Sequence, residues 1–366
     1  MELQLLAALL TFYDKLFNLI RPFAVEEYRY CEYGACMHYL TLKMTFRAED
    51  ETAFPMNPVN TFRGALGYAL KSISCKYRNA FGNKLVCNSC EQSRQCPYAL
   101  CYETNKSHFG DLPIANLKSF EIPRLMYIDC GFPGNSVFKP GERFSFPIRL
   151  LGSAVSVAPY LIIAAKKAGE DGLRGARSLL ELIEDEDWNE VWTFGGDRIN
   201  IPDPKSLYIP EPSLNFKEKT EIKLSLVTPV AFKDGNTHKI SREPDFSRII
   251  GSLMRRYTVF EATEGKILNW RFDEISEMAA KVIISGMNIE PIYWERYSTR
   301  QLQRMAITGI IGEVRFIGPI AGFMDLLEAG EIIRCGRSIS FGQGRISVTQ
   351  YRHVSNRDEF QGYLPV

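Results

Sequence analysis

The order in which strand and helix patterns follow one another most constrains the fold of this chain of 366 residues. Apolar and polar residues alternate over 40–46, which is the period of a half-buried strand. A helix is predicted from Asn57–Pro58, an N-cap residue followed by a first-turn proline. Further patterns predict strands near 122–130 and at 143–150, a helix at 157–168 and a strand near 177–184. The first half therefore has the order strand-helix-strand, twice.

The same order recurs after residues 201–218, a polar, proline-rich stretch that we interpret as a linker. Ile222, Leu224 and Leu226 alternate with polar residues as a strand does. The remaining patterns predict helical segments at 243–260 and 273–285, strands at 288–297 and 305–317, a helix at 319–330 and a strand at 344–351. Two copies of a ferredoxin-like, RNA-recognition-like unit explain this recurrence. The predicted fold class is α+β with two tandem ferredoxin-like domains.

The apolar start of the chain is expected to be an amphipathic helix and not an export signal. Asp14 and Lys15 interrupt it, and it has neither a positive n-region nor a small-residue cleavage site. No stretch approaches the roughly twenty apolar residues that a membrane span needs. These features predict a cytoplasmic protein with no membrane partner.

The predicted parts are a helical N-terminal extension (1–35), a first ferredoxin-like domain (36–200) with a cysteine-rich insert (75–101), the linker (201–218) and a second ferredoxin-like domain (219–366) that contains a glycine-rich loop.

The nine cysteines indicate a metal site more than a disulfide framework. Their number is odd, and no export signal accompanies them. Thiolates at CxxC spacing can fold around one tetrahedral ion, and a second pair closes such a site. A structural zinc is therefore predicted, with free thiols as the alternative; an all-cysteine site is closed, so no catalytic metal is expected. The predicted ligands are Cys75, Cys87, Cys90 and Cys96, with Cys101 as a possible replacement for one of them.

The predicted helix that begins at Pro58 has a second face, formed by Arg63, Gly64, Gly67, Tyr68 and Lys71. Each glycine costs a helix interior about 1 kcal/mol, so close approach of another backbone or of a phosphate is expected to offset that cost. Tyr68 and Lys71 would then present a hydroxyl and a cation at that surface. The alternative is a helix that packs tightly on its sheet, with a solvated lysine.

Basic residues gather at two further places. The net charge is only +1, so an RNA partner would have to use such local patches. One patch is the glycine-rich run 336–345, whose exposed N–H groups could cradle phosphates, although plain turn chemistry also explains its glycines. The other surrounds Trp294 and could grip phosphates and stack bases, or be a solvated turn. The residues predicted to bind RNA are Arg63, Arg296, Tyr297, Arg300, Arg304, Arg337, Gly342, Gly344 and Arg345.

These residues resemble a known family, the CRISPR-associated endoribonucleases of the RAMP superfamily that process repeat RNA, and their cysteine-rich, zinc-insert subgroup in particular. The stretches that carry the resemblance are FRGALGYALK (62–71), the insert ending in CPYALCYE, 144–169, 294–316 and GRSISFGQGRISV (336–348). The resemblance implies two ferredoxin-like domains with RNA held along the cleft between them. It also implies metal-independent cleavage in each repeat, in which the 2′-hydroxyl attacks the adjacent phosphate and leaves a 2′,3′-cyclic phosphate.

The chain departs from the family pattern in its histidines. Many relatives have a catalytic histidine on the first helix, around the position of Tyr68, whereas the four histidines of this chain lie elsewhere. Some relatives use tyrosine, lysine and arginine, so the resemblance implies Tyr68 and Lys71 as catalytic residues, then His38, with Arg63 as a phosphate clamp. The four histidines are His38, His108, His238 and His353.

Two other functions fit the same residues. One is a non-cleaving RAMP-type subunit that binds RNA within a CRISPR effector complex, and the other is a zinc-stabilised scaffold for protein partners. The expected partners are CRISPR repeat RNA and, for an effector subunit, other CRISPR proteins. No small-molecule cofactor is expected.

Overall fold

The computed structural model describes residues 36–353 except 55–56, 76–86, 88–89, 105–121, 130–134, 197, 216–217, 234–239, 242–243 and 299–302. The chain divides into two compact units, Met1–Gly34 and Ala35–Val366, and every described residue belongs to the second. The predicted N-terminal extension lies outside the described residues. None of the described helices is long and apolar enough to cross a membrane.

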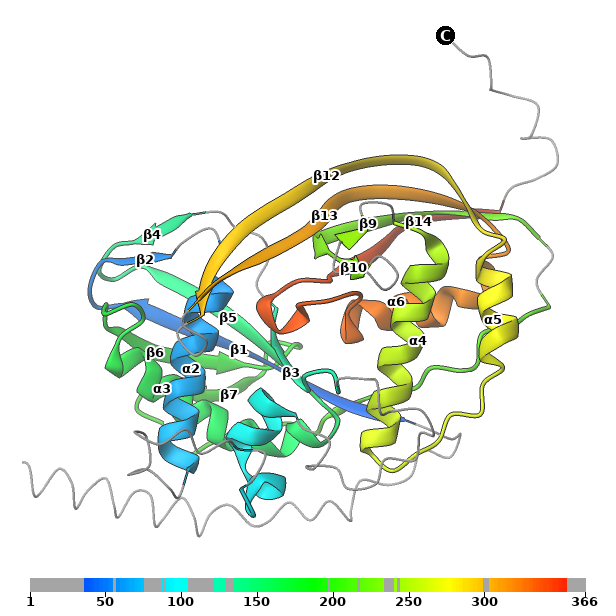
Figure 1. Ribbon diagram of the computed structural model, residues 1–366. Helices are drawn as coiled ribbons and strands as arrows, with labels where there is room; N and C mark the ends of the chain where they lie inside the picture. Colours follow the sequence, from blue (N-terminus) through cyan, green and yellow to red (C-terminus); the bar gives the residue numbers. More distant parts are fainter. Residues whose placement is uncertain are drawn as a thin grey trace, which may run out of the picture. The chain divides into compact units, whose positions relative to one another are not determined.

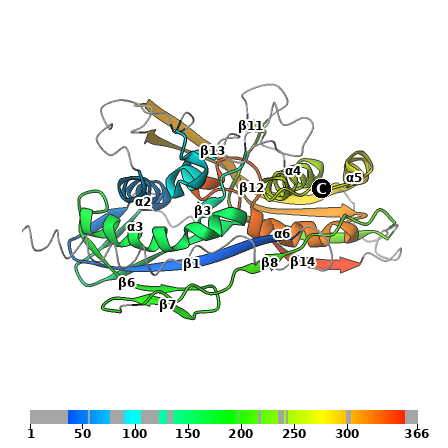
Figure 2. The same ribbon diagram turned by 90° about the horizontal axis from the view of Figure 1, so that it is seen from below.

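The first domain is built on an antiparallel sheet with the strand order β3-β5-β1-β6-β7. Figure 2 shows its two helices, α2 and α3, side by side on one face of the sheet. Taken along the chain, β1, α2, β3, β5, α3 and β6 form the ferredoxin-like pattern, with the second strand at one edge and the fourth beside the first. The bounds are β1 (Met37–Ala48), α2 (Pro58–Ser74), β3 (Met126–Ile128), β5 (Arg143–Leu151), α3 (Ala158–Asp171), β6 (Ser178–Glu184) and β7 (Glu190–Thr193).

The second domain repeats this arrangement with the sheet order β12-β13-β9-β14 (Figure 1). Its helices α4 and α6 occupy the two helical places of the pattern, so the predicted α+β class with tandem ferredoxin-like domains is confirmed. The bounds are β9 (Thr220–Val230), α4 (Phe246–Thr263), α5 (Phe272–Ala279), β12 (Ile283–Ser298), β13 (Gln303–Gly318), α6 (Met324–Ile333) and β14 (Ile346–His353).

Short elements complete the described chain. A β2-β4 pair and a β10-β11 pair each form a two-stranded sheet, and β8 pairs with the start of β1. The short strands are β2 (Thr52–Phe54), β4 (Ser136–Phe138), β8 (Lys205–Leu207), β10 (Phe232–Lys233) and β11 (Ile240–Ser241). The 3-10 and π segments are η4 (Ser93–Gln95), η5 (Ala99–Glu103), η8 (Gly152–Val157), η9 (Ala321–Phe323) and η10 (Ile339–Phe341).

Local sequence explains why α2 forms where it does. The side chain of Asn57 accepts a hydrogen bond from the Val59 N–H at 3.1 Å, and Pro58 opens the first turn. Phe62 is buried and stacks on Phe146 of β5, with ring centroids 4.2 Å apart. Burial of this apolar face fixes α2 on the sheet and leaves its opposite face exposed.

One predicted element is wrong at its end. The helical segment expected at 273–285 stops at Ala279, and residues 283–285 belong to β12. Ile283 and Ile284 pair with Ile317 and Phe316 of β13, and β-branched residues favour such pairing over a helix. Residues 205–207, inside the predicted linker, form β8; the boundaries of the two domains and the linker stay a prediction.

Candidate active site

The exposed face of α2 carries two of the residues predicted for catalysis. The side chain of Tyr68 is 67% exposed, and the half-buried Lys71 follows one turn later on the same side of the helix. A Cβ atom at Gly64 would meet nothing within 4 Å. The structure therefore brings a hydroxyl and a cation together on a helix that is open to close approach at Gly64.

Gly67 has a different role from Gly64. A Cβ atom at position 67 would lie 2.5 Å from Cε1 of Tyr102 and 2.8 Å from Cζ of the same ring. Such separations are too short for real carbon atoms, so the Tyr102 ring fits against α2 only because residue 67 is glycine. Packing therefore accounts for Gly67, whereas it does not account for Gly64.

Arg63 is held between aromatic rings. Its guanidinium carbon lies 4.6 Å from the ring centroid of Tyr102 and 5.1 Å from that of Phe341. The Nε atom of Arg63 is buried without a hydrogen-bond partner among the described residues. Because Phe341 precedes the glycines of the C-terminal loop, Arg63 links the α2 face to that loop.

The glycine-rich loop lies at the N-terminal end of α2. The Asn57 side-chain amide donates a hydrogen bond to the Phe341 carbonyl at 3.2 Å, and a Cβ atom at Gly342 would lie 3.0 Å from Val59. Gly342 and Gly344 have φ angles of +80° and +85°, in the left-handed region that favours glycine. Both glycines are thus explained by the turn itself, which places the loop beside the predicted catalytic helix.

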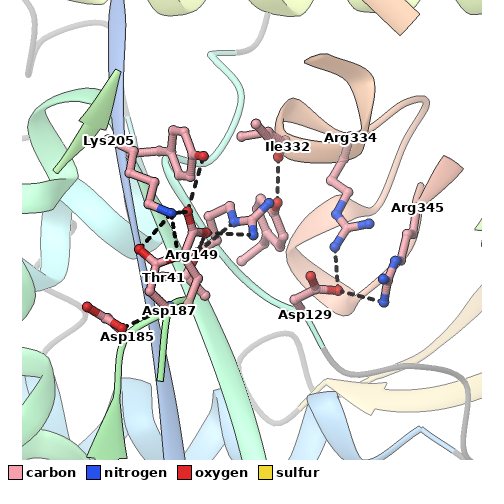
Figure 3. A network of polar contacts seen from close by, with 12 residues as sticks. Thr41, Asp129, Arg149, Asp185, Asp187, Lys205, Ile332, Arg334 and Arg345 are labelled. Carbon is pink, nitrogen blue, oxygen red and sulfur yellow. Dashed lines mark hydrogen bonds and ion pairs between the residues drawn. The ribbon is translucent and has the colours of Figure 1, made fainter. Parts of the chain in front are cut away.

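The two arginines of the loop lie near its two ends. Arg337 and Arg345 are both exposed, and the Nη1 atom of Arg345 lies 3.7 Å from Oδ1 of Asp129 (Figure 3). Because the guanidinium of Arg345 is exposed and this separation is long, the ion pair contributes little to stability.

Behind the loop lies a group of buried and half-buried residues that we call the arginine seam: Tyr127, Asp129, Arg149, Arg256 and Arg334. Arg334 pairs with Asp129, and the Tyr127 hydroxyl donates a hydrogen bond to the Ile332 carbonyl (Figure 3). Burial lowers the pKa of Arg256 to about 10. Burial also opposes the charge of Arg149, but Tyr127, Asp129 and Glu186 together hold its pKa above the usual value. The seam joins β3 of the first domain to α4 and the end of α6 in the second.

Sequence reasoning did not single out Asp129, Arg149 or Arg256. Each is a charged residue within or beside an apolar element, and no local spacing marks it. Their contacts with distant segments, such as Asp129 with Arg334 and Arg256 with the Ile333 carbonyl, form only after the chain has folded.

His38 lies apart from the other predicted catalytic residues. It pairs in register with Ser206 at the start of β1, and Figures 1 and 2 both show this end of β1 toward α4, with α2 toward the other end of the strand. Burial and the charge of Lys266 lower the pKa of His38, which keeps the imidazole neutral. His108 and His238 lie outside the described residues, as does the side chain of His353.

The second predicted basic patch lies on the β12-β13 hairpin. Tyr297 and Arg304 are register partners, and the exposed side chain of Arg304 pairs with Glu295 at 3.4 Å. The side chains of Arg296 and Tyr297, and the whole of Arg300, lie outside the described residues. The described part of this patch is therefore a strand pair with one exposed cation.

The cysteines of the insert follow directly on α2. Cys75 caps its end, with its N–H donating to the Lys71 carbonyl at 3.0 Å, and none of the five is in a disulfide. Burial raises the pKa of Cys87, and the nearby thiols of Cys96 and Cys75 raise it further by electrostatic repulsion. Across the described residues, no three His, Cys, Asp or Glu side chains are arranged to hold a metal ion. Four thiols fit zinc by their chemistry, and the metal stays a prediction.

Two family models match the chain. Residues 37–204 match a family described as an N-terminal domain. Residues 224–346 match the family of the CRISPR-associated endoribonuclease Cas6. The second domain of the chain is therefore similar to that family. The resemblance predicted from the sequence is confirmed for this part of the chain, whereas the zinc-insert subgroup stays a prediction.

Solved structures of Cas6 proteins are similar to the chain over most of its length. Thermus thermophilus Cas6 is 13% identical, with 86% of this chain and 100% of that chain covered and a TM-score of 0.49. A Cas6 chain in a product complex is also 13% identical, with 85% of this chain and 99% of that chain covered and a TM-score of 0.48. A chain of a partial Cas6-RT-Cas1–Cas2 complex is 11% identical, with 87% of this chain and 47% of that chain covered and a TM-score of 0.48. No curated protein has a significant match to the sequence.

Proposed function

We propose that this protein binds CRISPR precursor repeat RNA and cleaves it within each repeat by metal-independent attack of the 2′-hydroxyl, which yields mature guide RNAs. The observation that carries the proposal is the α2 face, where Tyr68 and Lys71 stand one turn apart beside the open backbone at Gly64. The match of residues 224–346 to the Cas6 family supports an RNA endonuclease, and the α2 face would supply the groups that the reaction needs.

The reaction needs a base for the 2′-hydroxyl, an acid for the leaving oxygen and a cation for the phosphorane charge. Tyr68 and Lys71 are the side chains that would exchange protons with the two oxygens, and Lys71 would also bring positive charge to the phosphate. Arg63, held between two rings, would act as the phosphate clamp. The products would be a 2′,3′-cyclic phosphate and a 5′-hydroxyl, and no metal ion would have to generate hydroxide.

RNA on either side of the scissile phosphate would lie along the glycine-rich loop and the β12-β13 hairpin. Arg337 and Arg345 offer exposed cations on the loop, and Arg304 offers one on the hairpin. These contacts are to phosphates, so they set the register of the RNA more than its sequence. Imposing that register is how binding aligns the 2′-hydroxyl with its phosphate.

A structural zinc held by Cys75, Cys87, Cys90 and Cys96 is part of the proposal. Cys101 is fully buried, whereas these four cysteines are partly exposed. We therefore keep the four as the proposed ligands.

Repeat RNA incubated with the protein in excess chelator tests the proposed function. We expect a single cut in each repeat, and the upstream product should carry a 2′,3′-cyclic phosphate. A cut that leaves a 5′-phosphate, or one that chelator abolishes at short times, would rule out the mechanism.

A second candidate function is that of a non-cleaving RAMP-type subunit that binds RNA. The absence of a catalytic histidine from α2 favours it, and tight RNA binding without any cut would establish it.

A further inference from the structure

Two tyrosines, Tyr98 at the end of the cysteine-rich insert and Tyr102 directly after it, pack against the part of α2 that carries the proposed cleavage residues. Figures 1 and 2 both show the cyan segment with η4 and η5 beside the second half of α2. Tyr98 and Tyr102 stack on each other in this segment, with ring centroids 5.1 Å apart and an interplanar angle of 4°. They form one rigid aromatic pair, which we call the tyrosine pair.

Tyr102 contacts Arg63 in two ways. Its hydroxyl donates a hydrogen bond to the Arg63 carbonyl at 2.9 Å, and its ring lies under the guanidinium at 4.6 Å. The same ring fills the space that any side chain at position 67 would take. Tyr102 is 7% exposed, so these contacts are shielded from water.

Tyr98 makes the equivalent contact with Lys71. The Lys71 Nζ atom lies 5.0 Å from the Tyr98 ring centroid, and the Tyr98 hydroxyl donates to Oε1 of Glu103 at 3.4 Å. A ring face attracts an ammonium group through the ring quadrupole. The Tyr98 ring therefore contacts the ammonium group that the proposed reaction would use.

We infer that Tyr98 and Tyr102 are positioning residues of the cleavage site: the insert orients Lys71 and Arg63 through the tyrosine pair. The inference rests on the proposed function, because it assigns Lys71 and Arg63 a task in RNA cleavage. It gives the insert a role in the reaction beyond folding. The insert acts on the rate through two aromatic rings and contributes no group to the chemistry itself.

A double-mutant cycle on the full chain tests this inference. Tyr98→Leu is made in the parent and in Lys71→Ala, and the single-turnover cleavage rate is measured at saturating repeat RNA. We expect Tyr98→Leu to slow the parent about tenfold and to leave Lys71→Ala unchanged, because the ring acts through the ammonium group. Tyr98→Phe keeps the ring and should retain the parent rate. Binding of an uncleavable RNA with one 2′-deoxy nucleotide should change less than threefold in all of these variants.

Two further variants test whether a loss of folding explains the slower cleavage. Tyr98→Met fills more of the space of the ring than Tyr98→Leu does, because the methionine side chain is longer and flexible. In the same double-mutant cycle it should slow the parent and leave Lys71→Ala unchanged. Tyr208→Leu is the matched control, since Tyr208 is an exposed tyrosine outside the insert; its rate should equal that of the parent. Thermal unfolding of each variant shows which proteins are folded at the assay temperature.

The outcomes separate the inference from the function on which it rests. If the parent cuts RNA and the effects of Tyr98→Leu and Lys71→Ala multiply independently, the positioning role is wrong and the proposed function stands. If Tyr98→Phe is as slow as Tyr98→Leu, the hydroxyl and not the ring face matters, and the inference is again wrong. If the parent cuts no repeat RNA, the proposed function fails and the inference fails with it.

Discussion

Tyr68 is exposed and Lys71 is half-buried, so neither side chain contributes much to the core. We therefore expect Tyr68→Phe and Lys71→Ala each to slow cleavage about 100-fold, the lower range of general acid–base effects. RNA affinity should fall less, because the proposed interactions strengthen in the transition state. Single-turnover rates and binding of a 2′-deoxy RNA measure the two effects. Equal losses in rate and affinity would make both residues simple binding residues.

The two glycines of α2 should respond differently to the same substitution. Gly64→Ala adds a Cβ atom in open space and should stabilise the helix by about 1 kcal/mol. Gly67→Ala drives a Cβ atom into the Tyr102 ring and should destabilise the protein by about 1–3 kcal/mol. Urea unfolding of the two variants gives both values. A Gly67→Ala protein as stable as Gly64→Ala would contradict the packing of Tyr102 on α2.

The elements themselves could largely be predicted from the sequence, because their signals are local. Alternation over 40–46 marks β1, and Asn57–Pro58 marks the first turn of α2. The end of α5 was missed because the pairing of Ile283 with β13 is decided by residues more than thirty positions away. The fit of Gly67 to Tyr102 was equally out of reach, since glycine in a helix indicates close approach without naming the partner.

The glycine-rich loop should contribute charge more than shape to RNA binding. Replacing Arg337 and Arg345 together by Ala should weaken binding and reduce the slope of log affinity against log salt by about one phosphate contact per arginine. Affinity measured across a salt series gives that slope. Replacing Arg174 by Ala is the control, since Arg174 is an exposed arginine in the turn after α3 and outside the predicted RNA-binding residues, and it should leave the slope unchanged. The same slope in the double variant and the parent would remove the loop from the RNA site.

The insert should bind one zinc ion per chain. Cys87→Ser removes a predicted ligand and should release the metal and loosen the insert, without removing any group that takes part in the chemistry. Metal analysis of the purified parent and variant measures the zinc content, and limited proteolysis reports on the insert. A parent protein that contains no zinc would show the prediction to be wrong.

At the scale of the whole molecule, contacts between distant segments join the two domains. Glu264 accepts a hydrogen bond from the Ser153 N–H at 2.8 Å, and Lys266 donates one to the Cys36 carbonyl at 2.6 Å. Asp129 and Arg334 add a buried ion pair from segments that lie far apart in the chain. Such pairs leave no trace in a single sequence, so the way in which the domains meet could not be predicted from it.

Glu261, a buried carboxylate beside Lys266, should make the stability of the protein depend on pH. Glu261 is fully buried at the end of α4, 3.8 Å from Lys266, and burial raises its pKa to about 7. In the unfolded chain its pKa is the ordinary 4.5, so the folded protein binds more protons between these two values. The stabilising effect of the neutral form is therefore present below about pH 4.5 and is lost as the pH rises toward 7.

Glu261→Gln should remove this dependence, because the amide stays neutral at every pH. Other carboxylates titrate in the same range, so the informative quantity is the difference in unfolding free energy between the variant and the parent. We expect that difference to shift in favour of the variant by roughly 2 kcal/mol between pH 5 and pH 7.5. Urea unfolding at a series of pH values measures it. A difference that stays constant across the series would mean that Glu261 is charged in the folded protein, with Lys266 compensating for its burial.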